Sequence, residues 1–305
     1  MQALIVEYLR YCKTNKRLDE LTIKAYRIDL YQFSDHFGNI DIVAITPKEM
    51  EAYIAMLHNK YRPKTVKRKI ASIKAFFNYT YRRDIISTNP FDKITTGFRE
   101  PATIPKTIPL SSVEKILKAA YNEKNHGITE RKRENAIRDI AVMEMLFATG
   151  IRISELCSLA PDSVDIANHT VRILGKGNKE RLIQIENEST LNALSHYRNV
   201  YKESILKCHR FFVNKNNTCL TEQSARRMIR RYTELASVDQ HITPHMFRHT
   251  FATSLLDADV DIRYIQELLG HSSIATTQIY THVSMSKQKE ILATKHPRNA
   301  FNIEE

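Results

Sequence analysis

Five basic side chains, two of them histidines, and one tyrosine stand in four short segments of the chain. The segments are ATGIRISEL (148–156), GKGNKER (175–181), PHMFRH (244–249) and LGHSSIATTQIYTH (269–282). The candidate catalytic residues are Arg152, Lys176, His245, Arg248, His271 and Tyr280. The planar, charged guanidinium of arginine donates paired hydrogen bonds to phosphate oxygens. An activated tyrosine is a nucleophile. Together these residue types predict covalent chemistry on a phosphodiester.

Taken singly, none of these residues specifies a reaction. Arg152 follows a predicted helix end, where a cation often interacts with the helix dipole. His245 and His249 stand four residues apart on a predicted helix, which is the spacing of a zinc-binding pair. The sequence lacks the glutamate of an HExxH motif, and no third ligand is implied. Packing or helix-terminus roles are therefore the better interpretation of this pair, and no metal site is predicted.

In their order along the chain, the six residues resemble the pattern of the tyrosine recombinase family, which includes phage integrases and Xer-type enzymes. That family carries Arg, Lys, His-x-x-Arg, His or Trp, and Tyr, and this chain fills all six positions. The flanking sequences TGIRISEL, TPHMFRHTFAT and LGHSSIATTQIYTH are also similar to the family. The resemblance covers nearly the whole chain. Two departures are Phe247, where leucine is more usual, and a longer charged insert near 124–134.

The resemblance implies a site-specific DNA recombinase that works through a covalent 3′-phosphotyrosine and a Holliday junction, without a metal or nucleotide cofactor. It implies a tetramer on double-stranded DNA sites, either homomeric or paired with a related recombinase. An accessory DNA-bending or regulatory protein is a further expected partner. The biological role is left open between chromosome dimer resolution, mobile-element integration or excision, and DNA inversion.

The chemistry of the residues supports the same division of roles. Arg152 and Arg248 would stabilise the charge that gathers on the non-bridging oxygens. A phenol has an ordinary pKa of about 10, so Tyr280 needs help to lose its proton, and His245 is the candidate. Lys176 is the candidate general acid for the departing 5′ oxygen. The remaining residue, His271, would donate a hydrogen bond to the phosphate or orient the tyrosine.

Three other functions compete with this interpretation. A type IB topoisomerase-like enzyme would share the chemistry, but the short chain and two-domain layout argue against it. A DNA-binding protein of the same fold without activity would not need the full catalytic set. A zinc hydrolase built on His245 and His249 lacks its base and third ligand.

Composition favours a polyanionic partner. The 305 residues carry a net charge of +12, which a DNA duplex would attract. The seven glycines form neither a P-loop nor a GxGxxG motif, so ATP or dinucleotide chemistry is not expected. No CxxC pair occurs, so the cysteines are expected to be reduced. With no apolar run of membrane-spanning length and no signal peptide, we expect a cytoplasmic, nucleoid-associated protein.

Hydrophobic spacing predicts a mainly α fold. Residues 1–88 are expected to form an all-α DNA-binding domain, and 111–305 a mixed α+β catalytic domain, mostly helical with a small sheet. The segment 89–110 between them holds four prolines and is expected to be an extended linker. Strands are predicted near 169–174 and 181–186, joined by a basic turn. The tail after Tyr280 would form a helix that either packs on its own domain or, as the resemblance implies, docks on a neighbouring protomer.

Local signals predict where several helices begin and end. Thr46 is expected to cap a helix that begins at Pro47, and Ser111 or Ser112 to cap the helix SVEKILKAAYNE. Gly150 is expected to end the apolar helix AIRDIAVMEMLFAT. The charged insert near 124–134 is expected to be either a surface loop or an extension of the helix ends.

Six basic residues are candidates for contacts with DNA phosphates. Four belong to the predicted helix RPKTVKRKIASIKAFFNYTYRRD, whose apolar side would hold Val66, Ile70, Ile73, Phe76 or Phe77, and Tyr81. Two others belong to the predicted hairpin. The set is Lys64, Lys67, Arg68, Lys74, Lys179 and Arg181. A solvated basic face remains the alternative for any single helix of this kind.

Overall fold

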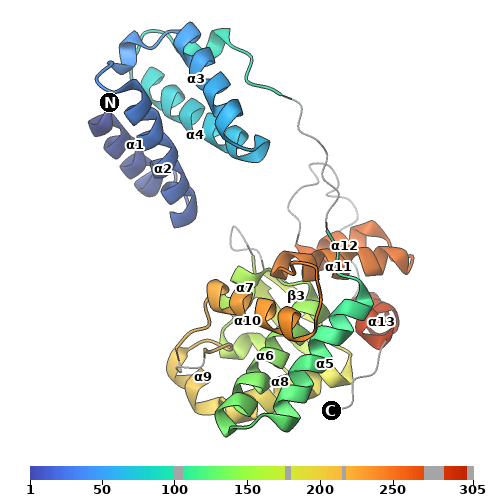
Figure 1. Ribbon diagram of the computed structural model, residues 1–305. Coiled ribbons are helices and arrows are strands. Elements are labelled where there is room, and N and C mark those ends of the chain that lie inside the picture. The colour runs from blue at the N-terminus through green and yellow to red at the C-terminus, as the bar shows by residue number, and fades with distance from the viewer. Residues whose placement is uncertain (99–105, 176–179, 215–217, 271–284, 301–305) are drawn as a thin grey trace. The chain divides into compact units, whose positions relative to one another are not determined.

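The computed structural model describes residues 1–98, 106–175, 180–214, 218–270 and 285–300. The chain divides into two compact units, Met1–Thr103 and Ile104–Glu305, which carry the blue and the green-to-red colours of Figure 1. The division falls within the segment 89–110, which was expected to separate two domains. As predicted, the fold is mainly helical, with one small sheet, in the second unit. No helix in the described ranges has the length and apolarity needed to cross a bilayer.

Unit 1 is built from helices only within its described residues. α2 packs against both α1 and α4, and α3 packs against α4. The elements are α1 (Gln2–Thr14), α2 (Glu20–Phe37), η1 (Ile42–Ala44), α3 (Pro47–Lys60), α4 (Pro63–Tyr81) and η2 (Pro90–Lys93). The predicted start of α3 is confirmed, because the Thr46 hydroxyl accepts from the Glu49 backbone N–H and the Glu49 carboxylate accepts from the Thr46 N–H. This reciprocal capping satisfies donors that a helix start leaves unpaired.

The core of unit 1 is rich in aromatic side chains. Phe33 of α2 lies edge-on to Tyr53 of α3 and Phe77 of α4, which joins three helices by contacts that favour such geometry. The prediction for Tyr81 was wrong, since 46% of this side chain is exposed. Tyr79 is buried in its place, and its hydroxyl donates to Glu7 of α1. Near its C-terminal end α4 faces α1, and this contact selects the earlier tyrosine.

The segment 89–110 is not extended throughout. Its first residues form the short 3₁₀ turn η2, and Phe91 is buried in the core of unit 1. At the other end, Ile108 is buried in the core of unit 2, where its N–H donates to Thr250. Apolar side chains at both ends therefore attach this segment to the two units.

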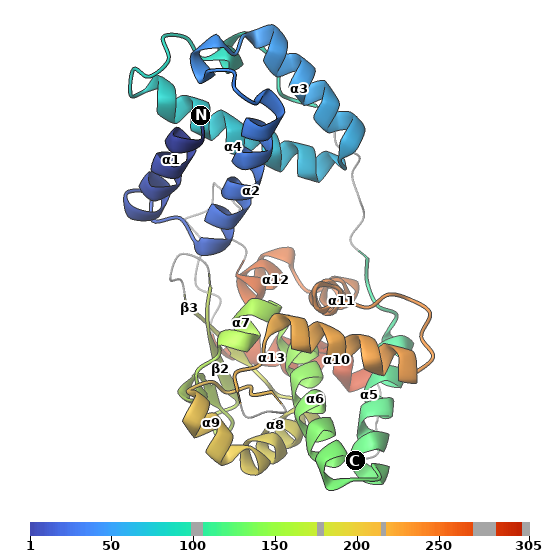
Figure 2. The same cartoon turned by 60° about the vertical axis from the view of Figure 1, so that its left-hand side comes forward.

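Unit 2 surrounds the long helix α6, against which α5, α8 and α11 pack. Figure 2 shows α6 lying among these neighbours with the sheet at one end. The helices are α5 (Leu110–His126), α6 (Glu130–Thr149), α7 (Ile153–Ser158), α8 (Glu188–Val200), α9 (Lys202–Cys208), α10 (Glu222–Leu235), α11 (Pro244–Asp257), α12 (Ile262–Leu269) and α13 (Met285–Lys295), with 3₁₀ turns η3 (Pro161–Ser163) and η4 (Pro297–Ala300). Every residue from Arg138 to Thr149 is buried, so the second half of α6 forms the centre of this core.

Two local predictions in unit 2 need correction or completion. Ser111 and Ser112 do not cap α5, because the helix begins at Leu110 and the Pro109 carbonyl accepts from the N–H of Ser112 and of Val113. The charged insert near 124–134 extends the helix ends, which was one of its two expected forms.

The small sheet is a three-stranded antiparallel meander of order β1-β2-β3. The strands are β1 (Val164–Asp165), β2 (Thr170–Leu174) and β3 (Glu180–Gln184). The predicted hairpin is confirmed, with Val171 opposite Ile183 and Ile173 opposite Arg181. The two-residue strand β1 was not predicted, because so short a segment carries no alternation of apolar residues.

The tail packs on its own unit. Ile291 and Leu292 of α13 are buried in the core of unit 2. Beyond α13, the Arg298 Nε donates to Glu144 Oε1 of α6 at 3.2 Å, and both side chains are buried. The Nε2 of His296 lies 3.2 Å from the Phe147 carbonyl oxygen, and burial lowers the pKa of His296 to about 4. Docking of the tail on a neighbouring protomer stays a prediction.

Candidate active site

The site begins where the buried helix α6 ends. Gly150 takes a left-handed conformation (φ 58°, ψ 21°) and its N–H donates to the Leu146 carbonyl, which confirms the predicted C-terminal glycine. A Cβ on Gly150 would lie 2.7 Å from Phe251 Cδ1 and 2.8 Å from Leu269 Cδ2. Helices α11 and α12 therefore approach the backbone closely at this point. The chain then turns so that Arg152 stands directly before α7.

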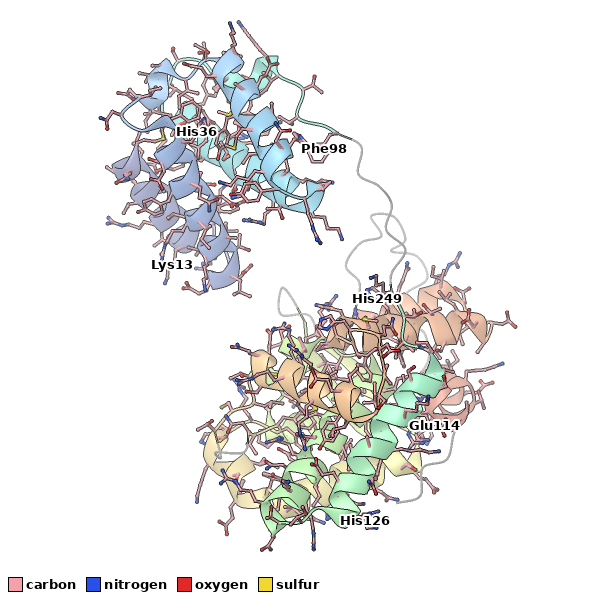
Figure 3. The ribbon with its side chains drawn as sticks, in the orientation of Figure 1. Lys13, His36, Phe98, Glu114, His126 and His249 are labelled. Atoms are coloured by element: carbon pink, nitrogen blue, oxygen red, sulfur yellow. The ribbon has the colours of Figure 1, made fainter. Side chains whose placement is uncertain are left out.

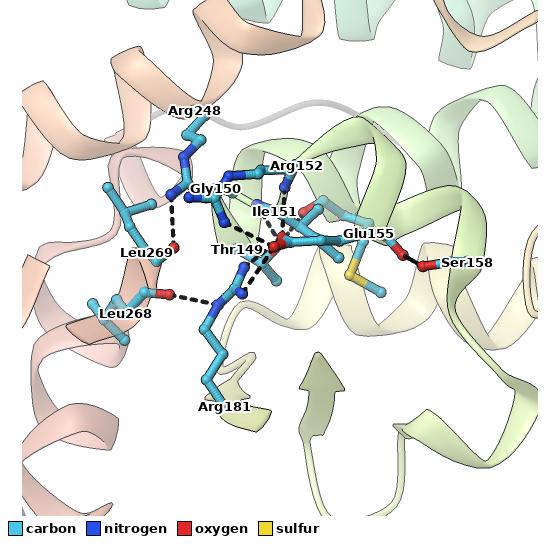
Figure 4. Close-up of polar contacts among 11 residues, drawn as sticks. Thr149, Gly150, Ile151, Arg152, Glu155, Ser158, Arg181, Arg248, Leu268 and Leu269 are labelled. Atoms are coloured by element: carbon cyan, nitrogen blue, oxygen red, sulfur yellow. Dashed lines mark hydrogen bonds and ion pairs between the residues drawn. The ribbon is translucent and has the colours of Figure 1, made fainter. Parts of the chain in front are cut away.

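Arg248 reaches the same turn from α11. Its Nη1 donates to the Gly150 carbonyl at 2.8 Å, and its Nη2 donates to the Leu269 carbonyl at 2.6 Å. Both bonds can be followed in Figure 4. Gly150 precedes Arg152 by two residues, so these bonds bring Arg248 close to Arg152 although the two are distant in sequence. They also hold the guanidinium between the C-terminal ends of α6 and α12. The structure therefore places Arg248 at the turn that precedes Arg152, close enough for the charge of Arg152 to act on it.

The electrostatics of the site favour an anion. Burial and the positive charges of Arg152 and Arg181 lower the pKa of Arg248 to about 10, because neighbouring cations disfavour a further positive charge. At neutral pH the guanidinium is still protonated. The site thus concentrates cationic charge in a partly desolvated place, where a phosphate would be bound more strongly than in water.

Glu155 lies between two of these arginines (Figure 4). Its Oε1 accepts from Arg152 Nη1 at 2.8 Å, and its Oε2 accepts from Arg181 Nη2 at 2.7 Å and from the Arg152 backbone N–H at 3.0 Å. Burial alone would raise the pKa of Glu155, but the bonds from Arg181 and Arg152 outweigh it and hold this pKa below its ordinary value. The carboxylate is ionised and orients both side chains.

Sequence reasoning missed Glu155. The signal was present in ISEL, where a carboxylate stands three residues after Arg152 and thus on the same side of the following short helix. Glu155 was noted only as part of the sequence TGIRISEL that flanks Arg152. Its bond to a residue of β3 joins segments distant in sequence and could not be anticipated.

Comparisons with known proteins find relatives over nearly the whole chain. The model of the phage integrase family matches residues 106–287, and the phage integrase N-terminal SAM-like domain matches residues 5–84. A tyrosine recombinase of Agathobacter rectalis is 55% identical over 302 residues, covering 99% of both chains. The chain belongs to the tyrosine recombinase family. It is an enzyme that cleaves and rejoins DNA, and its general activity is site-specific recombination.

Other members of the family are more distant. The tyrosine recombinase XerC of Leptospira interrogans is 34% identical, over 95% of this chain and 92% of its own. Among solved structures, XerH bound to palindromic difH substrate in a post-cleavage complex matches with a TM-score of 0.71 at 22% identity, covering 93% of this chain and 83% of its own. A lambda integrase tetramer bound to a Holliday junction matches with a TM-score of 0.69 at 15% identity, covering 90% and 75%. These two structures show the shared fold.

Only part of the predicted catalytic set lies in the described chain of this recombinase. His245 stands exposed on the first turn of α11, one helical turn before Arg248. Lys176, His271 and Tyr280 lie outside the described residues, as does Lys179 of the predicted DNA-contact set. Arg152, His245 and Arg248 are thus the members of the set that the structure describes.

His249 lies one turn beyond His245, and its exposed side chain faces a shallow pocket. Figure 3 labels it at the surface of unit 2. The pocket is lined by residues from the start of unit 2 and from the approach to α11, namely Lys106, Thr107, Gln240, His241, Thr243 and Met246. Among the residues that the structure places, no group of three metal-ligating side chains includes His245 and His249.

The predicted basic face of α4 is exposed. Lys64, Lys67 and Lys74 all point away from the core of unit 1. Arg68 is 43% exposed and forms an ion pair with buried Asp29, which also accepts from buried Lys69 at 2.9 Å. The structure thus places these cations on the surface of one helix, where a phosphate backbone could reach them.

Proposed function

We propose that this chain is a site-specific recombinase that cuts one DNA strand with Tyr280, forms a 3′-phosphotyrosine and rejoins the end to another strand through a Holliday junction. The observation that carries this proposal is the meeting of Arg152 and Arg248 at the turn after α6. Two fixed guanidiniums beside one another are suited to the two non-bridging oxygens of a phosphodiester. The complete set of family residues in the sequence supplies the remaining groups.

In the proposed reaction, Arg152 and Arg248 bind the scissile phosphate and stabilise the charge that develops on it. His245 assists the loss of the proton from Tyr280, whose oxygen attacks phosphorus in line with the departing 5′ oxygen. Lys176 donates a proton to that oxygen, and His271 donates a hydrogen bond to the phosphate or orients the tyrosine. A 5′ hydroxyl from the partner strand then attacks the phosphotyrosine, so rejoining needs no ATP.

Contacts with the DNA backbone are proposed for both units. Lys64, Lys67, Arg68 and Lys74 are exposed on α4, and Lys179 belongs to the hairpin sequence. Such contacts raise affinity for any sequence and weaken with salt, because binding releases condensed counterions. Arg181 belonged to the same predicted set, and a different role for it is argued below.

The proposed assembly is a tetramer on two double-stranded sites, either homomeric or shared with a related recombinase. The solved lambda integrase tetramer bound to a Holliday junction has the same fold, which supports this arrangement. Chromosome dimer resolution, mobile-element movement and DNA inversion remain the candidate roles, with or without an accessory DNA-bending protein.

The covalent step is tested with a nicked suicide substrate. A binding site is first selected from random duplexes, and a nick is placed so that the short 5′-hydroxyl fragment diffuses away after cleavage. We expect a protein–DNA adduct on a denaturing gel with the wild type, with the label retained on the strand that ends in the 3′ phosphate. Adduct formation should withstand a metal chelator.

Tyr280→Phe is the matched control, because it removes one oxygen atom. An adduct that persists in this variant would show that another residue is the nucleophile. A label that remains on the 5′ side would contradict the proposed polarity. Two selected sites in direct or inverted orientation on a plasmid then distinguish deletion from inversion, and relaxation without exchange would indicate a topoisomerase.

A further inference from the structure

Arg181 is a cation of the site whose side chain is mostly buried. It belongs to β3, and 11% of its side chain is exposed. Its Nη2 donates to Glu155 Oε2 at 2.7 Å, its Nη1 to Glu155 Oε1 at 3.2 Å, and its Nε to the Leu268 carbonyl at 3.1 Å (Figure 4). One side chain therefore binds both oxygens of the carboxylate and the C-terminal end of α12.

The contact with α12 is close as well as polar. Gly270 ends this helix in a left-handed conformation, with φ +61°, and a Cβ there would lie 3.1 Å from Arg181 Cδ and Nη1. A glycine at this position lets the guanidinium pack against the backbone. The next residue in the sequence is His271, a member of the proposed catalytic set.

The hydrogen bonds of Glu155 determine how many N–H donors of Arg152 are available to bind a phosphate. Arg181 occupies both carboxylate oxygens, whereas Arg152 donates one side-chain bond, from Nη1. Within the described part of the chain, the Nε and Nη2 groups of Arg152 have no hydrogen-bond partner, and 33% of its side chain is exposed. Without Arg181, an uncompensated carboxylate would favour a two-bond pair with Arg152, which is the usual geometry of arginine with a carboxylate.

We propose that Arg181 is a positioning residue for DNA cleavage: it holds Glu155 so that Arg152 faces the scissile phosphate, and it ties β3 to the end of α12. The inference rests on the proposed function and deepens it. It replaces the expectation that Arg181 contacts a DNA phosphate, since a guanidinium with three internal bonds and little exposure has few donors left for DNA. Its effect should therefore fall on the rate of cleavage and leave the affinity for DNA unchanged.

The test compares Arg181→Met with the double variant Arg181→Met/Glu155→Gln. In the single variant the carboxylate attracts Arg152, and we expect adduct formation at saturating DNA to slow about 100-fold, the size of effect that displaced catalytic groups produce. In the double variant glutamine keeps the shape of Glu155 without its charge, so we expect about a tenfold recovery. The dissociation constant for uncleaved DNA, measured with Tyr280→Phe as background, should change less than about twofold in both.

Several results would overturn the inference. Equal loss of rate in the single and double variants would indicate a general structural role. A wild-type rate combined with weaker binding, and a salt dependence reduced by about one counterion, would make Arg181 a phosphate contact. Absence of a Tyr280-dependent adduct from the wild type would refute the proposed function itself, and the inference with it.

Arg181→Lys keeps the test usable if Arg181→Met does not fold. Lysine preserves the charge next to Glu155 but cannot bond two carboxylate oxygens and a carbonyl in one plane. We expect cleavage about tenfold slower than the wild type at unchanged DNA affinity. Wild-type cleavage by a folded Arg181→Lys, verified by thermal unfolding, would show that the fork geometry has no positioning role.

Discussion

Replacement of Gly150 by alanine should destabilise unit 2 by an amount that the local geometry defines. With φ at +58°, an alanine would cost about 1–2 kcal/mol for its left-handed backbone. The new Cβ would also lie 2.7 Å from Phe251 and 2.8 Å from Leu269, both of which are buried. Overpacking of this kind costs about 1–3 kcal/mol, so we expect a total of about 2–5 kcal/mol.

Gly270→Ala is the matched control, because this glycine also ends a helix with positive φ, at +61°. Its added Cβ would lie 3.1 Å from Arg181 Cδ and Nη1, a longer approach than the 2.7 and 2.8 Å contacts at Gly150, so a shift of a few tenths of an ångström relieves it. The expected cost is therefore near that of the backbone conformation alone, about 1–2 kcal/mol. The difference between the two variants isolates the steric contact with Phe251 and Leu269.

Differential scanning calorimetry of the full chain measures both variants, with the transition of unit 1 as an internal reference. For a unit of this size each kcal/mol lowers the melting temperature by about 2–4 °C, so Gly150→Ala should melt roughly 4–20 °C lower. Its cleavage should also slow, since the Gly150 carbonyl holds Arg248. If Gly150→Ala proved as stable as Gly270→Ala, the steric argument would be refuted.

Three further predictions concern buried and exposed charges. Arg298→Met should cost about 3–5 kcal/mol at neutral pH, because it leaves the carboxylate of Glu144 buried without its ion pair. Burial raises the pKa of Glu144, so in the folded variant this carboxyl holds a proton that it releases on unfolding. The free energy of unfolding, measured with urea, should therefore fall from pH 5 to pH 8. A loss of stability that is the same at every pH would contradict this. Arg248→Lys should slow adduct formation about 10²–10³-fold with little change in melting temperature, and a rate near the wild type would remove Arg248 from the phosphate site. Replacing three lysines of α4 by alanine, namely Lys64, Lys67 and Lys74, should weaken binding to DNA of any sequence. Fluorescence anisotropy should show a salt dependence reduced by about three counterions. The control Lys207→Ala on α9 should leave binding unchanged.

The sequence predicts those elements whose signals are local. The capped start of α3 at Thr46, the end of α6 at Gly150 and the hairpin of β2 and β3 were all expected and are observed. Each depends on residues within one or two turns of one another, which is the range over which capping and alternation act. The meeting of Arg152 and Arg248 was also expected, but from the family resemblance.

Features set by tertiary contacts could not be predicted. The choice of Tyr79 over Tyr81 for burial depends on where α1 lies against α4. The bonds of Arg181 depend on how β3 meets α7 and α12, and no spacing in GKGNKER indicates them. A basic residue in a basic segment suggested a DNA contact, whereas its surroundings include a carboxylate that is distant in sequence. Burial of a cation beside such a partner is visible only in three dimensions.

The placement of Arg248 has a consequence for how the site meets its substrate. Its guanidinium is bound to the carbonyls of Gly150 and Leu269, at the ends of two helices packed into one core. In the proposed reaction, the phosphate would therefore meet a preorganised receptor, and little reorganisation energy would be spent on this cation. Substitutions far from the site that shift α6 along its axis should therefore slow DNA cleavage before they lower the melting temperature.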